Sequence, residues 1–375
     1  MLASRIFPRI GLPQLAALTL LLILLGQCLW FMAHVPITQI ESSYIEDGLL
    51  HVDRLLNAGT EYYSPLIPLL AGIPAHLIDS EGNFIHLSQY RFLIRLPFLI
   101  AGLLLGASLW YVARRLYGNF GGYIALGLYC FSPMVVTRSS QVQPDIIGAW
   151  GAFGLVFTAI AAAHTLYAPR DVVFWNGKRI LLMGISIALC VGSQWSLWIM
   201  LLPALAFMLW VGHVRPAAAL LIFAIACGVA FILLWGIASF RPAIFAEALR
   251  SAHWIESSPA QVSAKSVLTL LGLFFLQNGL GTLILLVLSL VTFAAWKRAR
   301  YFGNAAPLIT ATLLFVAALA MQHFAGLLFL FVALPFFMLF MAGVSADLLE
   351  TKYAVFANAV LDIGGLLQLA RPIAH

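Results

Sequence analysis

Residues 217–238 read AAALLIFAIACGVAFILLWGIA, an unbroken apolar run without one charged side chain. About 20 such residues in a helix cross the roughly 30 Å hydrocarbon core of a bilayer. Strands of a membrane barrel alternate apolar and polar residues, and this run does not alternate. The run therefore predicts a membrane-spanning helix.

Similar runs recur along the whole chain. Hydrophobic residues make up 63% of the sequence and charged residues 9%, against roughly 25% charged residues in soluble domains. Only helices and closed barrels satisfy their backbone groups inside lipid. We therefore expect an all-α polytopic membrane bundle of about ten (ten to twelve) transmembrane helices. The expected spans are about 13–34, 92–112, 121–137, 145–166, 180–193, 196–212, 217–238, 267–295, 305–322 and 325–345.

These spans predict one transmembrane domain over residues 1–350, with a first outer loop at 35–91. The first span is expected to be an uncleaved anchor, because its apolar core is too long for a secretory signal. The tail, 351–375, is expected to be cytoplasmic and to form an interfacial helix, with an eleventh span as the alternative.

Basic residues gather on one side of this topology. The positive-inside rule places that side, with both termini, in the cytoplasm. The formal net charge of +6 is then a consequence of topology, and no nucleic-acid partner is expected. The basic residues on that side are Arg5, Arg9, Arg114, Arg115, Arg170, Lys178, Arg179, Arg215, Lys297, Arg298, Arg300, Lys352 and Arg371.

The first outer loop carries an acidic pair, Glu46 and Asp47, close to the first span. Ser43 and Glu46 have the spacing of a capping box, which predicts that a helix begins there. A stripe at helical period makes this helix amphipathic, so we expect it to lie on the membrane surface. The stripe consists of Ile45, Leu49, Val52 and Leu56. A second apolar stretch follows at residues 66–78.

An ordered series of features along the chain resembles a known family. The acidic pair is followed by a G-x-x-Y-Y-x-P segment, Gly59 to Pro65, which contains Tyr62 and Tyr63. Arg95-Leu96-Pro97 then enters span two, and Gln143-Pro144-Asp145 enters span four. This series resembles the GT-C membrane glycosyltransferases, in the branch of protein O-mannosyltransferases and aminoarabinose transferases. The resemblance covers residues 35–170, and His323 with Leu334-Pro335-Phe336 is similar to a later segment of the family.

The resemblance implies transfer of a hexose or pentose from a polyprenyl-phosphate donor to an acceptor hydroxyl on the outer face. It places the protein in the plasma membrane of a bacterium, as part of cell-envelope synthesis. An acidic residue of the first loop would be the base. The family writes this pair as Asp-Glu and the present chain as Glu46-Asp47, so either residue can hold the role. Asp145 would be a second carboxylate, and Tyr62, Tyr63 and His323 would contact substrate.

The chemistry of such a reaction points to the same residues. A carboxylate can take the proton of the attacking hydroxyl, and the departing lipid phosphate needs a cation. Arg binds phosphate through two parallel hydrogen bonds. The outer cations include Arg138, Arg241 and Arg250. No cofactor is required by the sequence, and a divalent metal is an open alternative because carboxylates also serve as metal ligands.

Each residue also has a structural interpretation. Glu46 could complete the capping box, and Asp47 could favour the dipole of a first helical turn. Asp145 could cap span four, Arg138 could anchor at lipid headgroups, and His323 could be a hydrogen-bonded histidine. The rival functions are a transporter or lipid flippase, and a membrane scaffold without catalysis. The sugar, the acceptor and the oligomeric state are left open by the sequence.

Overall fold

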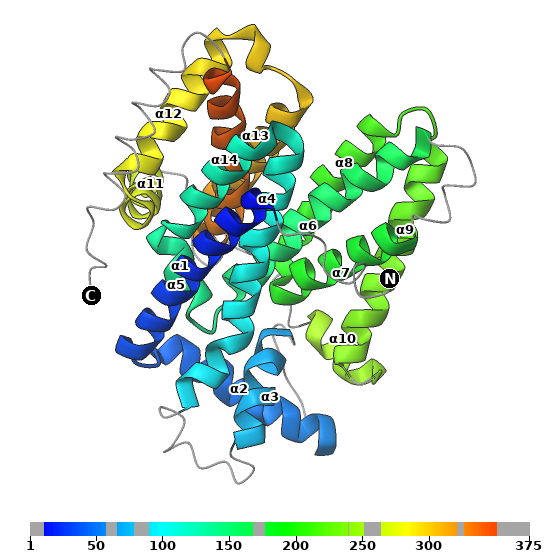
Figure 1. Cartoon of the computed structure of the whole chain (residues 1–375). Coiled ribbons are helices and arrows are strands. Elements are labelled where there is room, and N and C mark those ends of the chain that lie inside the picture. Colours follow the sequence, from blue (N-terminus) through cyan, green and yellow to red (C-terminus); the bar gives the residue numbers. More distant parts are fainter. Residues whose placement is uncertain are drawn as a thin grey trace, which may run out of the picture.

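The computed structural model describes residues 11–57, 66–78, 90–167, 177–238, 240–250, 264–320 and 326–350. Within these ranges every regular element is a helix, and the helices stand side by side as a bundle (Figure 1). Six are long and apolar enough to cross a membrane: α1 (Leu12–His34), α4 (Arg91–Cys130), α6 (Pro144–His164), α9 (Pro216–Ile237), α13 (Phe302–Ala320) and α14 (Gly326–Leu349). The polytopic all-α fold is confirmed, and the count of about ten spans stays a prediction.

Helix α4 contains two of the predicted spans. Its backbone turns at Gly118, which has φ 75° and ψ −171°. The Tyr129 hydroxyl donates to the Gly102 carbonyl oxygen at 2.7 Å, although the two residues are 27 positions apart. A straight helix would separate them by about 40 Å. The chain therefore reverses at Gly118, where an L side chain would be strained, and spans 92–112 and 121–137 lie against each other.

The predicted third span does not continue to residue 137. Its helix ends at Cys130, and a short helix α5 (Pro133–Ser139) follows. Ser132 is extended, with ψ 117°, as expected for a residue before proline. Pro133 also lacks the N–H that would continue the helix. The prediction of one continuous span was wrong for this reason.

The predicted eighth span, 267–295, is also broken. Helices α11 (Ala264–Asn278) and α12 (Leu280–Ala295) meet at 112°. Gly279 joins them with φ 87°. The buried Asn278 side chain donates to the Phe274 carbonyl at 2.9 Å and accepts the Ser132 hydroxyl at 2.9 Å. Two interruptions of helix structure, at residues 131–132 and 278–279, therefore stabilise each other inside the bundle.

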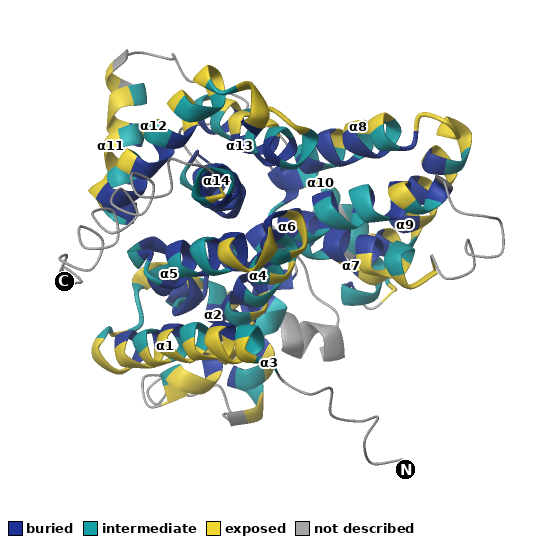
Figure 2. Cartoon of the chain, turned by 45° about the horizontal axis from the view of Figure 1, so that its top comes forward, coloured by how far each residue is buried: buried dark blue, intermediate teal, exposed yellow. Residues whose placement is uncertain are grey.

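The core is built around α14. Almost all of its side chains are buried, among them Phe329, Phe336 and Phe340. A helix that is apolar on every side packs inside a bundle, and Figure 2 shows α14 end-on among α4, α6, α12 and α13. The remaining helices of the bundle are α7 (Gly177–Ser193) and α8 (Leu201–Val211), with a 3-10 turn (Trp195–Met200) before α8. Both α7 and α8 are shorter than the six helices that are long enough to cross a membrane.

Three short helices lie at one end of the bundle, at the bottom of Figure 1. They are α2 (Gln39–Asn57), α3 (Leu66–Ile78) and α10 (Pro242–Arg250). The amphipathic helix expected in the first outer loop is therefore present as α2, with Ile45 and Leu49 of its predicted stripe buried. The side chains of Val52 and Leu56 lie outside the described residues.

Helix α2 begins earlier than predicted. The Thr38 N–H donates to Glu41 Oε2 at 2.9 Å, and the Glu41 N–H donates to the Thr38 hydroxyl at 3.3 Å. This reciprocal pair is a capping box. The box predicted at Ser43 was wrong, because the Ser43 hydroxyl donates to the Ile40 carbonyl within the helix. Asp47 lies more than two turns from the start, so a first-turn dipole role does not apply to it.

Candidate functional site

The acidic pair is positioned by a close crossing of α2 and α3. Gly48, the residue after Asp47, lies against the backbone of α3. A Cβ at Gly48 would overlap the Pro68 carbonyl oxygen and lie 2.8 Å from the Gly72 nitrogen. Only glycine at position 48 lets the two helix backbones come this close. The backbone of α2 next to Asp47 therefore packs directly against the backbone of α3.

A buried ion pair fastens the start of α2 to α4. Arg95 Nε donates to Glu41 Oε1 at 2.8 Å, and Arg95 Nη2 donates to Glu41 Oε2 at 2.7 Å. The exposed fractions of the two side chains are 1% and 0%. Guanidinium and carboxylate groups favour this geometry of two parallel hydrogen bonds. The ion pair therefore fixes the position of the beginning of α2 relative to α4.

The same ion pair brings in the short outer loop before α6. Glu41 Oε1 accepts the Val142 N–H at 3.0 Å. The Arg95 guanidinium also donates to the carbonyls of Val35 and Pro36, at 3.0 and 2.9 Å. Charged groups taken out of water must have all their hydrogen bonds satisfied. This network gives each nitrogen of the Arg95 guanidinium a hydrogen-bond partner, and it joins the end of α1, the start of α2 and the loop that carries Gln143 and Asp145.

Arg138 and Asp145 meet at the far side of this loop. Arg138 Nη1 donates to Asp145 Oδ2 at 2.9 Å and also to the Gln143 side chain. The Asp145 side chain is 8% exposed and the Arg138 side chain 19%. The N-cap of α6 is Gln143, so Asp145 lies inside the first turn and does not cap the helix. Its carboxylate is engaged with a cation instead.

Tyr44 connects the two parts of the site. Burial, together with the negative charges of Asp145 and Asp47, raises the pKa of the Tyr44 phenol to about 12. Both carboxylates are therefore close enough to act on one side chain. Tyr44 and Asp47 are three residues apart on α2 and share a face. Glu46 is exposed and, two residues from Tyr44, projects from another part of the helix.

Of the other residues predicted to contact substrate, the structure describes only the two arginines Arg241 and Arg250. Arg241 is half-buried directly before α10, and Arg250 is the exposed last residue of that helix. Helix α10 is at the same end of the bundle as α2 and α3 (Figure 1). Tyr62, Tyr63 and His323 lie outside the described residues.

The sequence reasoning missed Glu41, Arg95 and Tyr44 as parts of the site. One signal was present for Glu41, because Thr38 and Glu41 have the spacing of a capping box. Arg95 stands inside an apolar run, and a charge in such a run normally has a specific partner. Nothing local identified that partner, since Glu41 and Arg95 are 54 residues apart.

A metal-binding cluster is not found in the part of the chain that the structure describes, where no group of three or more His, Cys, Asp or Glu side chains converges. The carboxylate of Asp145 has a guanidinium as its neighbour. These side chains do not form the multi-oxygen ligand set that a divalent cation prefers.

The close crossing of α2 and α3 yields a testable prediction. We expect Gly48→Ala to separate the helices, displace Asp47 and destabilise the protein by about 1–3 kcal/mol, the usual cost of overpacking. The measurement is the thermal unfolding midpoint in detergent. Gly26→Ala on α1 is the matched control, since nothing lies within 4 Å of a Cβ there. Equal midpoints for the two variants would show that the crossing is not tight.

Comparison with known proteins gives a consistent picture. Residues 84–235 match the family model of dolichyl-phosphate-mannose-protein mannosyltransferase. No curated protein matches the chain. Among solved structures, the apo oligosaccharyltransferase of Archaeoglobus fulgidus is similar, with a TM-score of 0.61 and 14% identity. The match covers 97% of this chain and 55% of the archaeal one.

The same archaeal enzyme is also similar in other states. Its complex with an inhibitory peptide and a dolichol-phosphate has a TM-score of 0.61 at 13% identity, over 96% of this chain and 54% of that one. Its complex with Zn and sulfate has a TM-score of 0.57 at 14% identity, over 94% and 53%. The present chain therefore spans about half the length of the archaeal enzyme.

Proposed function

We propose that this chain transfers a sugar from a polyprenyl-phosphate donor to an acceptor hydroxyl. The premise is that it has the fold of the GT-C superfamily of membrane glycosyltransferases. The reaction takes place at the end of the bundle that carries α2, α3 and the loop before α6. The topology assigned from the basic residues makes that end the outer face.

The donor class is supported by what similar proteins are described as using. The matching family model is named for dolichyl-phosphate-mannose, and one solved structure of the archaeal enzyme holds a dolichol-phosphate. Both are polyprenyl phosphates. The transferred unit would be a hexose or a pentose, and the acceptor a glycan, lipid or protein hydroxyl.

Asp47 is the better candidate for the general base. Its side chain is exposed on the face of α2 that also carries Tyr44, so an acceptor hydroxyl can reach it. As the hydroxyl oxygen bonds to the anomeric carbon, its proton passes to the Asp47 carboxylate. The bond between the anomeric carbon and the phosphate oxygen breaks, and polyprenyl phosphate leaves with the electron pair.

Arg138 is the candidate group for the phosphate. Its two hydrogen bonds to Asp145 and Gln143 both use Nη1, and a guanidinium has five N–H donors in all. The Asp145 carboxylate orients the guanidinium. A fixed cation near the phosphate stabilises the charge that develops on the leaving group. The two carboxylates would thus have different roles, Asp47 as base and Asp145 as a positioning residue.

A metal is not part of this mechanism. The archaeal enzyme has been solved in complex with Zn and sulfate. Among the described residues of the present chain, no group of three or more His, Cys, Asp or Glu side chains could hold a metal ion. A divalent cation would have to compete with Arg138 for Asp145. The steps proposed here therefore rest on Asp47 and Arg138.

The observation that carries the proposal is the ion pair of Arg138 with the buried Asp145 carboxylate, at 2.9 Å, in the loop that the Val142 N–H bonds to Glu41 of α2. On the same helix, Tyr44 is half-buried, and the charges of both Asp145 and Asp47 raise the pKa of its phenol. A transport or flippase function has no comparable observation in its favour.

The first test concerns Asp145. Protein reconstituted in vesicles with a polyprenyl-phosphate sugar and an envelope extract as acceptor should release polyprenyl phosphate. We expect Asp145→Asn to lower the initial rate about 100-fold, since a misoriented Arg138 no longer stabilises the leaving group. Glu350→Gln, an exposed acid at the other end of the bundle, should keep the parent rate.

Two outcomes would contradict the proposal. Full activity of Asp145→Asn would remove Arg138 and Asp145 from the mechanism. Movement of the donor lipid across the vesicle membrane without release of polyprenyl phosphate would favour the flippase function instead.

A further inference from the structure

A cleft lies at the end of the bundle opposite the candidate site. It has a volume of about 690 Å³ and is lined by His164, Trp210, Val211, His213 and Phe302. His164 is the last residue of α6 and Asp145 is near its first, so a helix rise of about 29 Å separates the cleft from the candidate site. That distance is close to the thickness of the hydrocarbon core.

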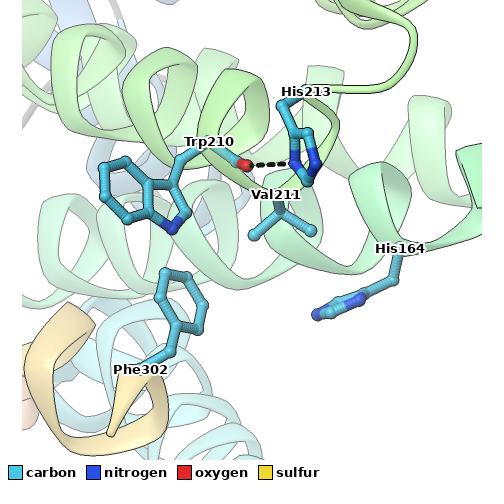
Figure 3. Close-up of a pocket in the computed structure, with 5 residues that line it drawn as sticks. All are labelled: His164, Trp210, Val211, His213 and Phe302. Carbon is cyan, nitrogen blue, oxygen red and sulfur yellow. Dashed lines mark hydrogen bonds between the residues drawn. The ribbon is translucent and has the colours of Figure 1, made fainter.

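The cleft has one aromatic wall and one imidazole wall (Figure 3). Trp210 and Phe302 stand side by side, from the end of α8 and the start of α13. Trp210 is 74% exposed, and Phe302 packs edge-on against Phe207 with ring centroids 5.9 Å apart. His164 points toward the cleft from the other side, across Val211.

Basic residues lie close in sequence to several residues that line the cleft. Arg179 Nη1 donates to the Ala161 carbonyl at 2.9 Å, in the last turn of α6 before His164. Arg215 is exposed two residues after His213, and Lys297 and Arg298 are exposed shortly before Phe302. Three basic segments from different parts of the sequence therefore adjoin residues that line the cleft. The topology expected from the basic residues puts this end of the bundle at the cytoplasmic membrane surface.

The two kinds of wall require an amphipathic occupant. An apolar chain can lie against Trp210 and Phe302, as aromatic rings do at membrane interfaces. A phosphate can accept from the imidazoles and the surrounding guanidinium groups. His213 Nδ1 is already hydrogen-bonded to the Trp210 carbonyl at 3.2 Å, which holds its ring in place.

We propose that this cleft binds an anionic phospholipid of the leaflet opposite the candidate active site. The net negative charge of the headgroup is the selected property, because the cations around the cleft repel the positive group of a zwitterionic lipid. This proposal does not depend on sugar transfer, and the bound lipid is distinct from the polyprenyl-phosphate donor.

The test uses the purified full chain in detergent and native mass spectrometry. The probes are phosphatidylglycerol and phosphatidylcholine with identical acyl chains. We expect the parent to bind one phosphatidylglycerol about tenfold more tightly than phosphatidylcholine, a ratio typical of one charge-assisted contact. The double variant Trp210→Ala/His164→Ala should bind phosphatidylglycerol about tenfold more weakly. Both replaced side chains are exposed, so the fold should be retained.

The matched control replaces another exposed tryptophan and histidine. Trp30 and His34 stack on α1, with ring centroids 4.5 Å apart, at the end of the molecule that carries α2. Trp30→Ala/His34→Ala should bind phosphatidylglycerol as the parent does. Equal binding of the two lipids by the parent, or equal losses in both double variants, would overturn the proposal. Neither result bears on sugar transfer.

Discussion

Asp47→Asn should lower the rate of sugar transfer by about 10²–10⁴-fold, the usual contribution of a positioned general base. The asparagine amide has nearly the same shape as the carboxylate but cannot take the proton of an acceptor hydroxyl. Because Asp47 is exposed on α2, the helix should remain folded. The measurement is the initial rate of polyprenyl phosphate release at saturating donor.

Glu46→Gln is the matched control for this prediction. Glu46 is the adjacent carboxylate and is equally exposed, but it is not among the groups that act on Tyr44. We expect its rate to stay within a few-fold of the parent. A large loss in Glu46→Gln with little loss in Asp47→Asn would exchange the roles of the two residues. Full activity in both variants would end the case for a base in the first outer loop.

Arg95→Met should be the most destabilising single change in the outer part of the protein. Removing the guanidinium leaves the fully buried Glu41 carboxylate without its cation, which typically costs about 3–5 kcal/mol. The carbonyls of Val35 and Pro36 lose a donor as well. The measurement is the free energy of unfolding in mixed detergent micelles, compared with the parent under the same conditions.

Two further variants test whether the destabilisation comes from the loss of the Arg95–Glu41 ion pair. Arg115→Met changes an exposed arginine of the same helix, whose described bond is to the Tyr111 hydroxyl, and should lie within about 0.5 kcal/mol of the parent. The double variant Arg95→Met/Glu41→Leu should be less destabilised than the sum of its single changes, because no unpaired charge remains. Simple additivity would show that the two side chains are not energetically coupled.

The elements predicted well are those that depend on local composition. A run such as residues 217–238 is helical wherever it is placed in lipid, and α9 covers it almost completely. Arg138 and Asp145 were also predicted as neighbours in one short loop, and they form an ion pair. The predicted start of α2 was wrong because it depends on an interaction between two distant segments as well as on a local cap. The start of α2 depends on Glu41. The Glu41 carboxylate forms an ion pair with Arg95 of α4 and accepts a hydrogen bond from the nearby Thr38 N–H.

The sequence by itself determined that this protein is a helical membrane bundle with an acidic pair outside its first span. Hydrophobic run length and charge placement are properties of short segments, and the bilayer acts on them directly. Only the tertiary structure decided where α4 reverses, where the span after residue 264 breaks, and which carboxylate meets Arg138. It also brought Asp145 and Asp47 close enough to Tyr44 to raise the pKa of its phenol. Those features depend on contacts between residues far apart in sequence, which form only when the helices pack.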